Sequence, residues 1–184
     1  MTSPCKFPPN TPFAGFLHCP HCGASALSLH GERAIHCAGC GFKFYFNCAS
    51  ATAAFLLHQG KLILGIRSNA PQKGLLDLPG GFIEYDETAE DALIREIREE
   101  LNISVSNPAY LTSAPNDYLY AGILYKTTDL YYVCNVDDIS GIEARDDVAD
   151  YLLIAPEDLD PQRLAFQSGR IALQRLLEYL RANG

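Results

Sequence analysis

The sequence predicts an α/β protein in which helices pack on both faces of a mixed sheet, preceded by a small zinc ribbon. Short apolar runs bounded by turn residues recur between positions 51 and 156, as in a sheet of short strands. Segments 88–101 and 163–182 place apolar residues at helical spacing. Two Cys-x-x-Cys pairs lie near the N-terminus. The expected domains are residues 1–48 for the ribbon and 49–184 for the larger domain.

The ribbon is predicted from four cysteines with metal-ligand spacing. They are Cys19, Cys22, Cys37 and Cys40, in the pairs CPHCG and CAGCG with 14 residues between them. Four thiolates fill the tetrahedral shell of Zn²⁺, so the site is expected to be structural and not catalytic. Gly23 and Gly41 follow the pairs, where a positive φ is often required. The module has few apolar residues, and we therefore expect the metal to replace a core.

The larger domain is expected to consist of several strands and two helices. Residues 51–57 and 61–66 predict a hairpin. Further strands are expected before the Pro-Gly-Gly turn at 79–81, at 118–125 and 129–136 joined by Lys-Thr-Thr, and at 151–156. The C-terminal helix would cover one face of the sheet with an apolar stripe formed by Ile171, Leu173, Leu176, Leu177 and Leu180.

Composition excludes some classes of function. The formal net charge is −8, and an acidic chain lacks the basic surface that general nucleic-acid binding requires. No apolar run approaches the length of a membrane span, and no segment resembles a secretory signal. We therefore expect a cytoplasmic protein that binds neither membrane nor nucleic acid.

Residues 80–101 concentrate eight carboxylates against two arginines. Glu96, Glu99 and Glu100 are spaced i, i+3, i+4, so on a helix their carboxylates lie on one side. Such crowding is costly unless a hard divalent ion binds, and oxygen ligands of this kind suit Mg²⁺ or Mn²⁺. The alternative is a solvated acidic face, which is the interpretation we give to Glu90 and Asp91.

The spacing is more specific than the charge. From Gly81 the chain reads five residues, Glu87, seven residues, and then Arg95-Glu96-Ile97-Arg98-Glu99-Glu100-Leu101-Asn102-Ile103. This resembles the signature of the Nudix hydrolases, with Asn102 in place of the last glycine. Asn tolerates a left-handed helix end better than other non-glycine residues, so the departure is expected to be harmless.

The resemblance implies an α/β/α sandwich that hydrolyses a nucleoside diphosphate linked to another moiety. It implies Mg²⁺ or Mn²⁺ held by Glu96, Glu99 and Glu100, with Glu87 assisting. Gly80 and Gly81 would form the loop that places the helix and contacts metal or substrate, and Arg95 would orient the glutamates. The general base stays open between Glu96 and Asp147, which lies in a loop before the last strand where some relatives carry an acidic residue.

A four-cysteine ribbon joined to such a domain resembles the NADH pyrophosphatase branch of the family. Those relatives carry Ser-Gln-Pro-Trp after the signature, where this chain has Ser113-Ala114-Pro115-Asn116 and no Trp at all. NADH specificity therefore does not carry over, and the substrate is not named by the sequence. The branch also implies a homodimer. Candidate substrate contacts, besides the two glycines, are Arg67, Pro115, Asn116 and Tyr118.

Two classes of function follow. The first is a metal-dependent hydrolase that releases a nucleoside monophosphate from a substrate such as NADH, NAD⁺, ADP-ribose or a nucleotide sugar. The second is a non-catalytic nucleotide sensor that regulates a partner through its ribbon. The intact set of carboxylates favours the enzyme.

Overall fold

The computed structural model describes residues 7–8 and 11–183. The chain forms two compact units, which are described separately. The first consists of Met1–Ala49 and Asp117–Lys126, and the second of Ser50–Asn116 and Thr127–Gly184. Among the described residues no helix has the length and apolar character needed to cross a bilayer.

The first unit contains a three-stranded antiparallel sheet of β1 (Leu27–Leu29), β2 (Ala34–Cys37) and β3 (Lys43–Tyr45). The expectation that this module lacks an apolar core is wrong. Its buried cluster is formed by Phe7, Phe13, Cys19, Leu27, Ile35 and Cys37, with further phenylalanines packed around it. The phenylalanines lie outside the two Cys-x-x-Cys turns in the sequence, and the fold brings them together in one cluster with Cys19 and Cys37.

One long hairpin contributes residues to both units. It consists of β8 (Ala109–Tyr120) and β9 (Ile123–Asn135), and its tip, Asp117–Lys126, belongs to the first unit. The predicted junction at Lys-Thr-Thr is wrong, because the chain turns at Ala121 and Gly122, which both have positive φ. Two consecutive left-handed residues suit the tight turn of a hairpin. Within the first unit the Tyr125 ring lies 5.8 Å from that of Phe46.

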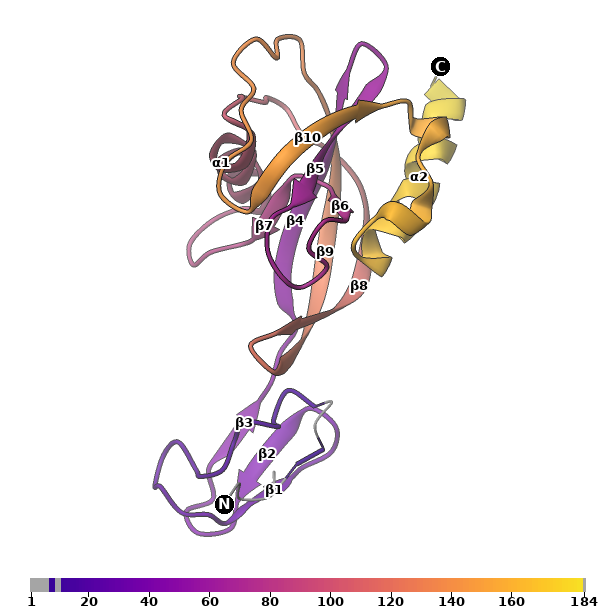
Figure 1. Cartoon of the computed structure of the whole chain (residues 1–184). Coiled ribbons are helices and arrows are strands. Elements are labelled where there is room, and N and C mark those ends of the chain that lie inside the picture. Colours follow the sequence, from indigo (N-terminus) through magenta and orange to yellow (C-terminus); the bar gives the residue numbers. More distant parts are fainter. Residues whose placement is uncertain (1–6, 9–10, 184) are drawn as a thin grey trace. The chain divides into compact units, whose positions relative to one another are not determined.

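The second unit is built on a mixed sheet with the order β10-β5-β4-β9-β8. The strands not yet placed are β4 (Ala49–His58), β5 (Lys61–Arg67) and β10 (Val148–Ile154), with the short β6 (Leu76–Asp77) paired to β5 and β7 (Gly80–Phe82) paired to β4. β4 and β9 run in the same direction (Figure 1), and the Val136 amide just after β9 donates to Leu57 O at the end of β4. β5 pairs antiparallel with both β10 and β4. The sheet therefore contains both parallel and antiparallel pairs, which confirms the predicted mixed sheet.

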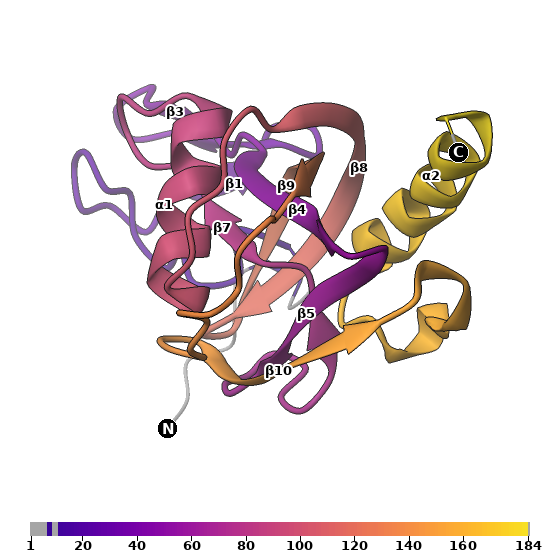
Figure 2. The same ribbon diagram turned by 90° about the horizontal axis from the view of Figure 1, so that it is seen from above.

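Two helices cover opposite faces of this sheet (Figure 2). α1 (Ala89–Leu101) buries Leu93, Ile97 and Leu101 against the face that carries Ala54 and Leu56. α2 (Gln167–Asn183) packs its apolar stripe, including Leu173 and Leu176, against the face that carries Phe55 and Tyr131. Successive residues of β4 thus enter different cores, as the period of a strand requires. The predicted sandwich is confirmed, although α2 begins four residues later than expected.

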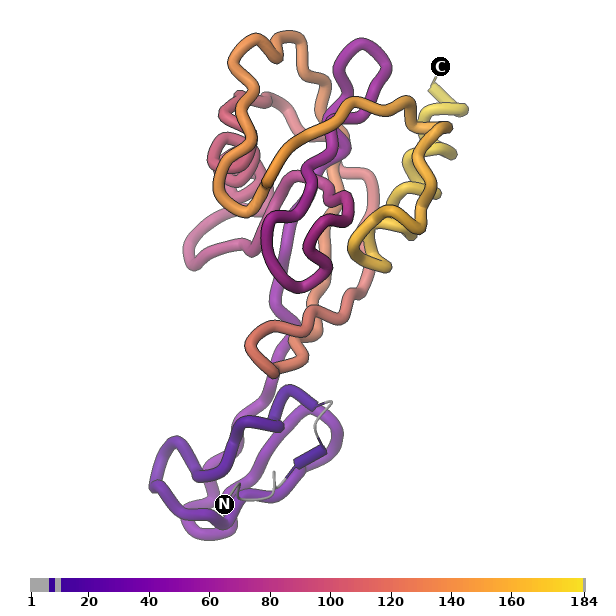
Figure 3. Tube along the Cα trace, in the orientation of Figure 1, coloured from indigo at the N-terminus to yellow at the C-terminus, as the bar shows by residue number. Residues whose placement is uncertain are grey.

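The segment between β9 and β10 runs beside the C-terminal end of α1, where Figure 3 traces it in orange. Two backbone hydrogen bonds hold it there, from Glu143 N to Leu101 O and from Arg145 N to Glu100 O. The Asn102 side chain adds a third, to Gly141 O at 3.0 Å. This placement brings the loop residue Asp147 to the same end of the sheet as the last turn of α1.

Candidate active site

Local signals fix where α1 begins and ends. Thr88 is the N-cap, and its hydroxyl accepts a hydrogen bond from the Asp91 amide at 3.1 Å. The helix ends at Asn102, which has a φ of 54° and is left-handed, as expected from the sequence. Its buried stripe faces the sheet, so the acidic residues of the last two turns lie on its other sides.

The glycine pair before α1 allows a close approach that no other residue would permit. Gly80 has a φ of 147°, and a Cβ built on it would lie 2.1 Å from Thr52 O. A Cβ on Gly81 would lie 2.4 Å from Glu96 Oε1. The Gly80 amide donates to Glu100 Oε2 at 3.0 Å. The loop therefore contacts two of the predicted metal ligands through backbone alone.

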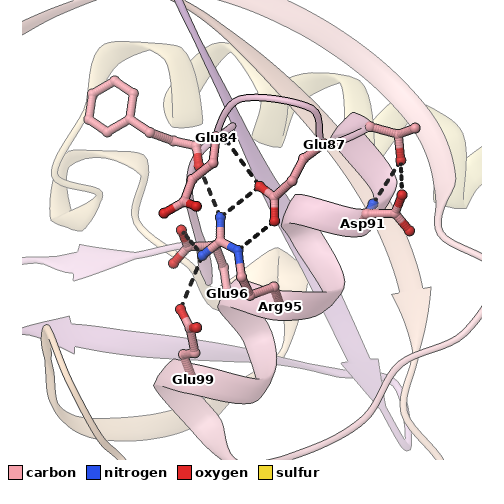
Figure 4. A network of polar contacts seen from close by, with 8 residues as sticks. Glu84, Glu87, Asp91, Arg95, Glu96 and Glu99 are labelled. Carbon is pink, nitrogen blue, oxygen red and sulfur yellow. Dashed lines mark hydrogen bonds and ion pairs between the residues drawn. The ribbon is translucent and has the colours of Figure 1, made fainter.

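Arg95 lies at the centre of a network of carboxylates (Figure 4). Its Nε donates to Glu87 Oε1 at 2.7 Å, and its Nη1 donates to Glu96 Oε1 at 2.8 Å and to Glu99 Oε2 at 3.1 Å. Its Nη2 donates to Glu87 Oε2 at 3.0 Å and to Phe82 O at 3.3 Å. One guanidinium thus fixes three of the predicted site carboxylates, and its hydrogen bond is the main reason that the pKa of Glu87 is lowered.

A pocket in the second unit joins residues from four parts of the chain. Its polar lining consists of Arg67, Asp77, Glu100 and Asp147. Arg67 Nη1 donates to Asp77 Oδ2 at 2.7 Å, and its Nε donates to Pro71 O at 2.8 Å. Asp147 Oδ1 accepts from Asn69 Nδ2 at 2.7 Å. A fixed cation therefore lies in one pocket with three acidic side chains.

Burial makes this end of the sheet costly for negative charge. Burial raises the pKa of Glu100 well above its ordinary value, and it also raises the pKa of Glu96. The pKa of Asp77 is raised to about 6, chiefly by burial and against the attraction of Arg67. Carboxylate oxygens are the donors that Mg²⁺ or Mn²⁺ takes, and a hard divalent cation would relieve this cost at Glu96 and Glu100. Among the described residues, however, the carboxylates of Glu96, Glu99 and Glu100 are not gathered within 4.8 Å of one another as the four cysteine sulfurs of the first unit are.

These raised pKa values predict how stability depends on pH without added Mg²⁺ or Mn²⁺. The folded chain binds protons at Asp77 and Glu100 more tightly than the unfolded chain does. The free energy of unfolding should therefore fall as pH rises from about 4, the unfolded value, through about 6, the folded value of Asp77. Thermal unfolding at a series of pH values tests this. Added Mg²⁺ should weaken the decline, whereas a stability that rises over this range would contradict it.

The two glycines predict a pair of variants with different outcomes. Gly81→Ala should leave the melting temperature nearly unchanged, because Glu96 can swing away from the new methyl group, but it should lower kcat about tenfold or more. Gly80→Ala meets backbone at Thr52 and should lower the free energy of unfolding by about 3 kcal/mol. Melting curves and initial rates of both variants would check this. Equal loss of stability in the two variants would contradict the assigned contacts.

The structure separates the predicted site residues into two groups. Glu87, Arg95, Glu96 and Glu99 belong to the arginine network, and Glu100, Arg67 and Asp147 line the pocket. Pro115 and Asn116 lie on β8 and do not line this pocket, and Tyr118 lies in the hairpin tip of the first unit. Sequence reasoning missed Asp77, although an acidic residue two positions before Pro-Gly-Gly is a signal that could have been followed.

The predicted zinc ligands come together in the first unit. All four cysteine sulfurs lie within 4.8 Å of one another, with Cys19 to Cys40 at 3.8 Å and Cys22 to Cys37 at 3.7 Å. A tetrahedron with Zn–S bonds of about 2.3 Å has edges of about 3.8 Å, so the geometry fits zinc. Gly23 and Gly41 have φ of 74° and 77°, as the turns require. Among residues 7–8 and 11–183, no other group of three potential ligands is gathered this closely.

The second unit is an α/β/α sandwich in which a glycine loop precedes a helix with acidic residues. Comparison with known proteins assigns this class of fold and site to a family. The family model described as the NUDIX domain matches residues 48–175. This is more than half of the chain, and the chain belongs to the Nudix hydrolase family. The expected resemblance is thereby confirmed at the level of the family.

Curated relatives point to one branch. The chain is 38% identical over 96 residues to the NAD-capped RNA hydrolase NudC of Pseudomonas fluorescens, covering 52% of this chain and 34% of the relative. It is 28% identical over 149 residues to NudC of Stutzerimonas stutzeri, covering 73% and 54%. The chain thus spans between a third and about half of the length of these relatives. This likeness, with the cysteine cluster, supports the expected relation to a ribbon-bearing branch.

Solved structures support the fold. The MutT NUDIX hydrolase of Burkholderia pseudomallei is 26% identical, with a TM-score of 0.61 over 70% of this chain and 98% of that one. A NUDIX hydrolase of Nitrosomonas europaea has a TM-score of 0.68 at 21% identity, over 89% of this chain and 90% of that one. At this identity the second likeness concerns the fold alone.

Proposed function

We propose that the chain is an Mg²⁺- or Mn²⁺-dependent hydrolase of a nucleoside diphosphate linked to another moiety, and that it releases a nucleoside monophosphate. The observation that carries the proposal is the pocket whose lining combines Arg67 with Asp77, Glu100 and Asp147, together with the Arg95 network. A diphosphate needs cations, and buried carboxylates are the groups that recruit them. The likeness to relatives named as hydrolases of NAD-capped RNA supports a two-part diphosphate such as NADH, NAD⁺, ADP-ribose or a nucleotide sugar.

Each site residue has a task under this proposal. Glu96, Glu99 and Glu100 would hold the divalent ion, which supplies Lewis acidity toward phosphate oxygens and water when it is bound. Arg95 keeps Glu96 and Glu99 in place from the side. The Gly80 amide fixes the orientation of Glu100, and Arg67 donates to a phosphate oxygen of the substrate.

The proton of the attacking water needs an acceptor. Two groups can serve, and they differ in their surroundings. Burial raises the pKa of Glu96, which makes its carboxylate a stronger proton acceptor. Asp147 lines the pocket, and its carboxylate accepts a hydrogen bond from Asn69. In pH–rate profiles, loss of the acidic limb in Glu96→Gln but not in Asp147→Asn would assign the base to Glu96, and the reverse to Asp147.

A substrate screen tests the function. NADH, NAD⁺, ADP-ribose, nucleotide sugars, dinucleoside polyphosphates, nucleoside triphosphates and an NAD-capped RNA oligonucleotide are each incubated with Mg²⁺ and with Mn²⁺. One class of two-part diphosphates should stand out in kcat/KM, because a site built to bind a base discriminates against analogues without it. The product should be a nucleoside monophosphate, and ¹⁸O-labelled water should mark the phosphorus attacked. The Glu99→Gln variant, prepared in parallel, controls for contaminating activity.

Other outcomes of the screen would change the proposal. A clear preference for triphosphates with release of pyrophosphate would overturn the substrate class but keep the chemistry. Tight binding of ADP-ribose with no turnover in either metal would favour the nucleotide sensor instead. Exclusive cleavage of capped RNA would overturn the expectation that nucleic acid is not a substrate. The expected homodimer stays a prediction, to be measured by light scattering.

A further inference from the structure

A buried polar cluster lies outside the site described above. Asp129 on β9 is 8% exposed, and both of its carboxyl oxygens accept hydrogen bonds. Thr127 Oγ1 donates to Oδ1 at 2.6 Å, and Ser168 Oγ donates to Oδ2 at 2.6 Å. The Tyr131 hydroxyl in turn donates to Ser168 Oγ at 2.8 Å. Neither Lys nor Arg pairs with Asp129 among the described residues, so hydroxyl groups alone satisfy this carboxyl.

This cluster fixes the first turn of α2. Ser168 is the second residue of the helix and is fully buried, so its hydroxyl ties the helix to β9. A Cβ built on the next residue, Gly169, would lie 3.8 Å from Leu78 Cδ1 and 3.9 Å from the Tyr131 hydroxyl. Hydrogen bonds set one rotation and one register of a helix, whereas apolar contacts leave both adjustable. The cluster thus determines where the chain entering α2 must lie.

That entering segment contacts the pocket. The Ala165 amide donates to Leu76 O at 2.8 Å, next to Asp77. The Phe166 ring lies against the guanidinium of Arg67, with 5.0 Å from Arg67 Cζ to the ring centroid. Contacts from the start of α2 therefore reach Leu76 and Leu78, on both sides of Asp77, and also the face of Arg67. Burial is the main cause of the raised pKa of Asp77, and the charge of Asp129 adds to it.

We propose that Asp129 is a positioning residue for substrate binding, which acts through Ser168 and Phe166 to hold the Arg67–Asp77 pair at the pocket. Three neighbours outside its own strand restrain the Arg67 side chain. Asp77 and Pro71 accept hydrogen bonds at the edge of the guanidinium, and the Phe166 ring lies against its face. Asp129 keeps the third of these in place. The proposal rests on the proposed function in giving Arg67 a phosphate to bind.

Two measurements on the zinc-containing chain of 184 residues test this inference. The first needs no substrate: hydrogen exchange of the Arg67 Nε–H, which donates to Pro71 O, is followed by NMR. In Ser168→Ala this proton should exchange about tenfold faster or more, because Phe166 no longer covers the guanidinium. Asp129→Asn keeps the volume and should give a smaller change of the same sign. The matched control is Leu176→Ala, which removes a fully buried contact of the same helix and should lower only the melting temperature.

The second measurement is kinetic, with ADP-ribose. Ser168→Ala should raise KM about fivefold to tenfold with kcat nearly unchanged, because a positioned phosphate contact is weakened and the chemistry is not. Phe166→Leu should do the same, and the double variant should add little beyond either one. Unchanged Arg67 exchange in Ser168→Ala, or an equal effect in Leu176→Ala, would overturn the inference. Altered exchange without any turnover of ADP-ribose would instead count against the proposed substrate class while the positioning role stands.

Discussion

Replacing Glu100 with glutamine is expected to lower kcat about a hundredfold or more while the fold is kept. The amide retains the volume of the side chain, and its oxygen can still accept from the Gly80 amide, which donates to Glu100 at 3.0 Å. It loses the negative charge that a divalent ion needs in a buried position. Glu99→Gln should act in the same direction. Steady-state rates with the substrate found by the screen measure both effects.

The control for this prediction lies on the same helix. Glu90 accepts a hydrogen bond from the Tyr132 hydroxyl at 2.8 Å and belongs to the first turn of α1, and it takes part in neither the ion pairs of Arg95 nor the lining of the pocket. Glu90→Gln should therefore turn over substrate at the wild-type rate. If Glu100→Gln kept a similar rate, the assignment of Glu100 as a metal ligand would be wrong, whatever the substrate.

Loss of one zinc ligand is expected to unfold the first unit. Structural zinc in small domains supplies folding free energy of about 10 kcal/mol or more. Cys37 is also fully buried within the aromatic cluster of this unit. Cys37→Ser should therefore lose both the metal and the packing around it. Elemental analysis of washed, folded wild-type protein should give about one zinc per chain, and limited proteolysis should cut the variant within residues 11–48.

Cys48 offers a matched control, because it is exposed and lies outside the cluster of four. Cys48→Ser should retain one zinc and the proteolytic pattern of the wild type. A zinc content near zero in wild-type protein whose first unit is still ordered would contradict the ribbon assignment. In that case the phenylalanine cluster alone would stabilise the unit.

The sequence predicted those features that depend on neighbours along the chain. The extent of α1 followed from its apolar spacing and the left-handed tolerance of Asn102. The cysteine cluster followed from two turns whose internal spacing fixes the positions of the sulfurs. In each case the interactions that decide the geometry lie within a few residues, so a local pattern contains them.

Features that depend on distant segments were not predictable in the same way. The turn at Ala121 and Gly122 lies inside an apolar run that reads as one strand, and only the pairing of β8 with β9 selects it. The core of the ribbon was missed because its phenylalanines are scattered before the first metal-binding turn and after the second. Asp77 gained its importance from Arg67, Glu100 and Asp147, which converge only in the folded chain.

The shared hairpin has a consequence for how the chain folds as it is synthesised. Residues up to Ala49 leave the ribosome before the second unit does, and they carry all four zinc ligands. Their unit nevertheless includes Asp117–Lys126, which emerge only after α1 and most of the sheet have been made. Zinc can therefore be captured early, while the full set of contacts around Phe46 waits for Tyr125. A nascent chain that stalls before this hairpin would hold its metal yet leave an aromatic surface open to chaperones.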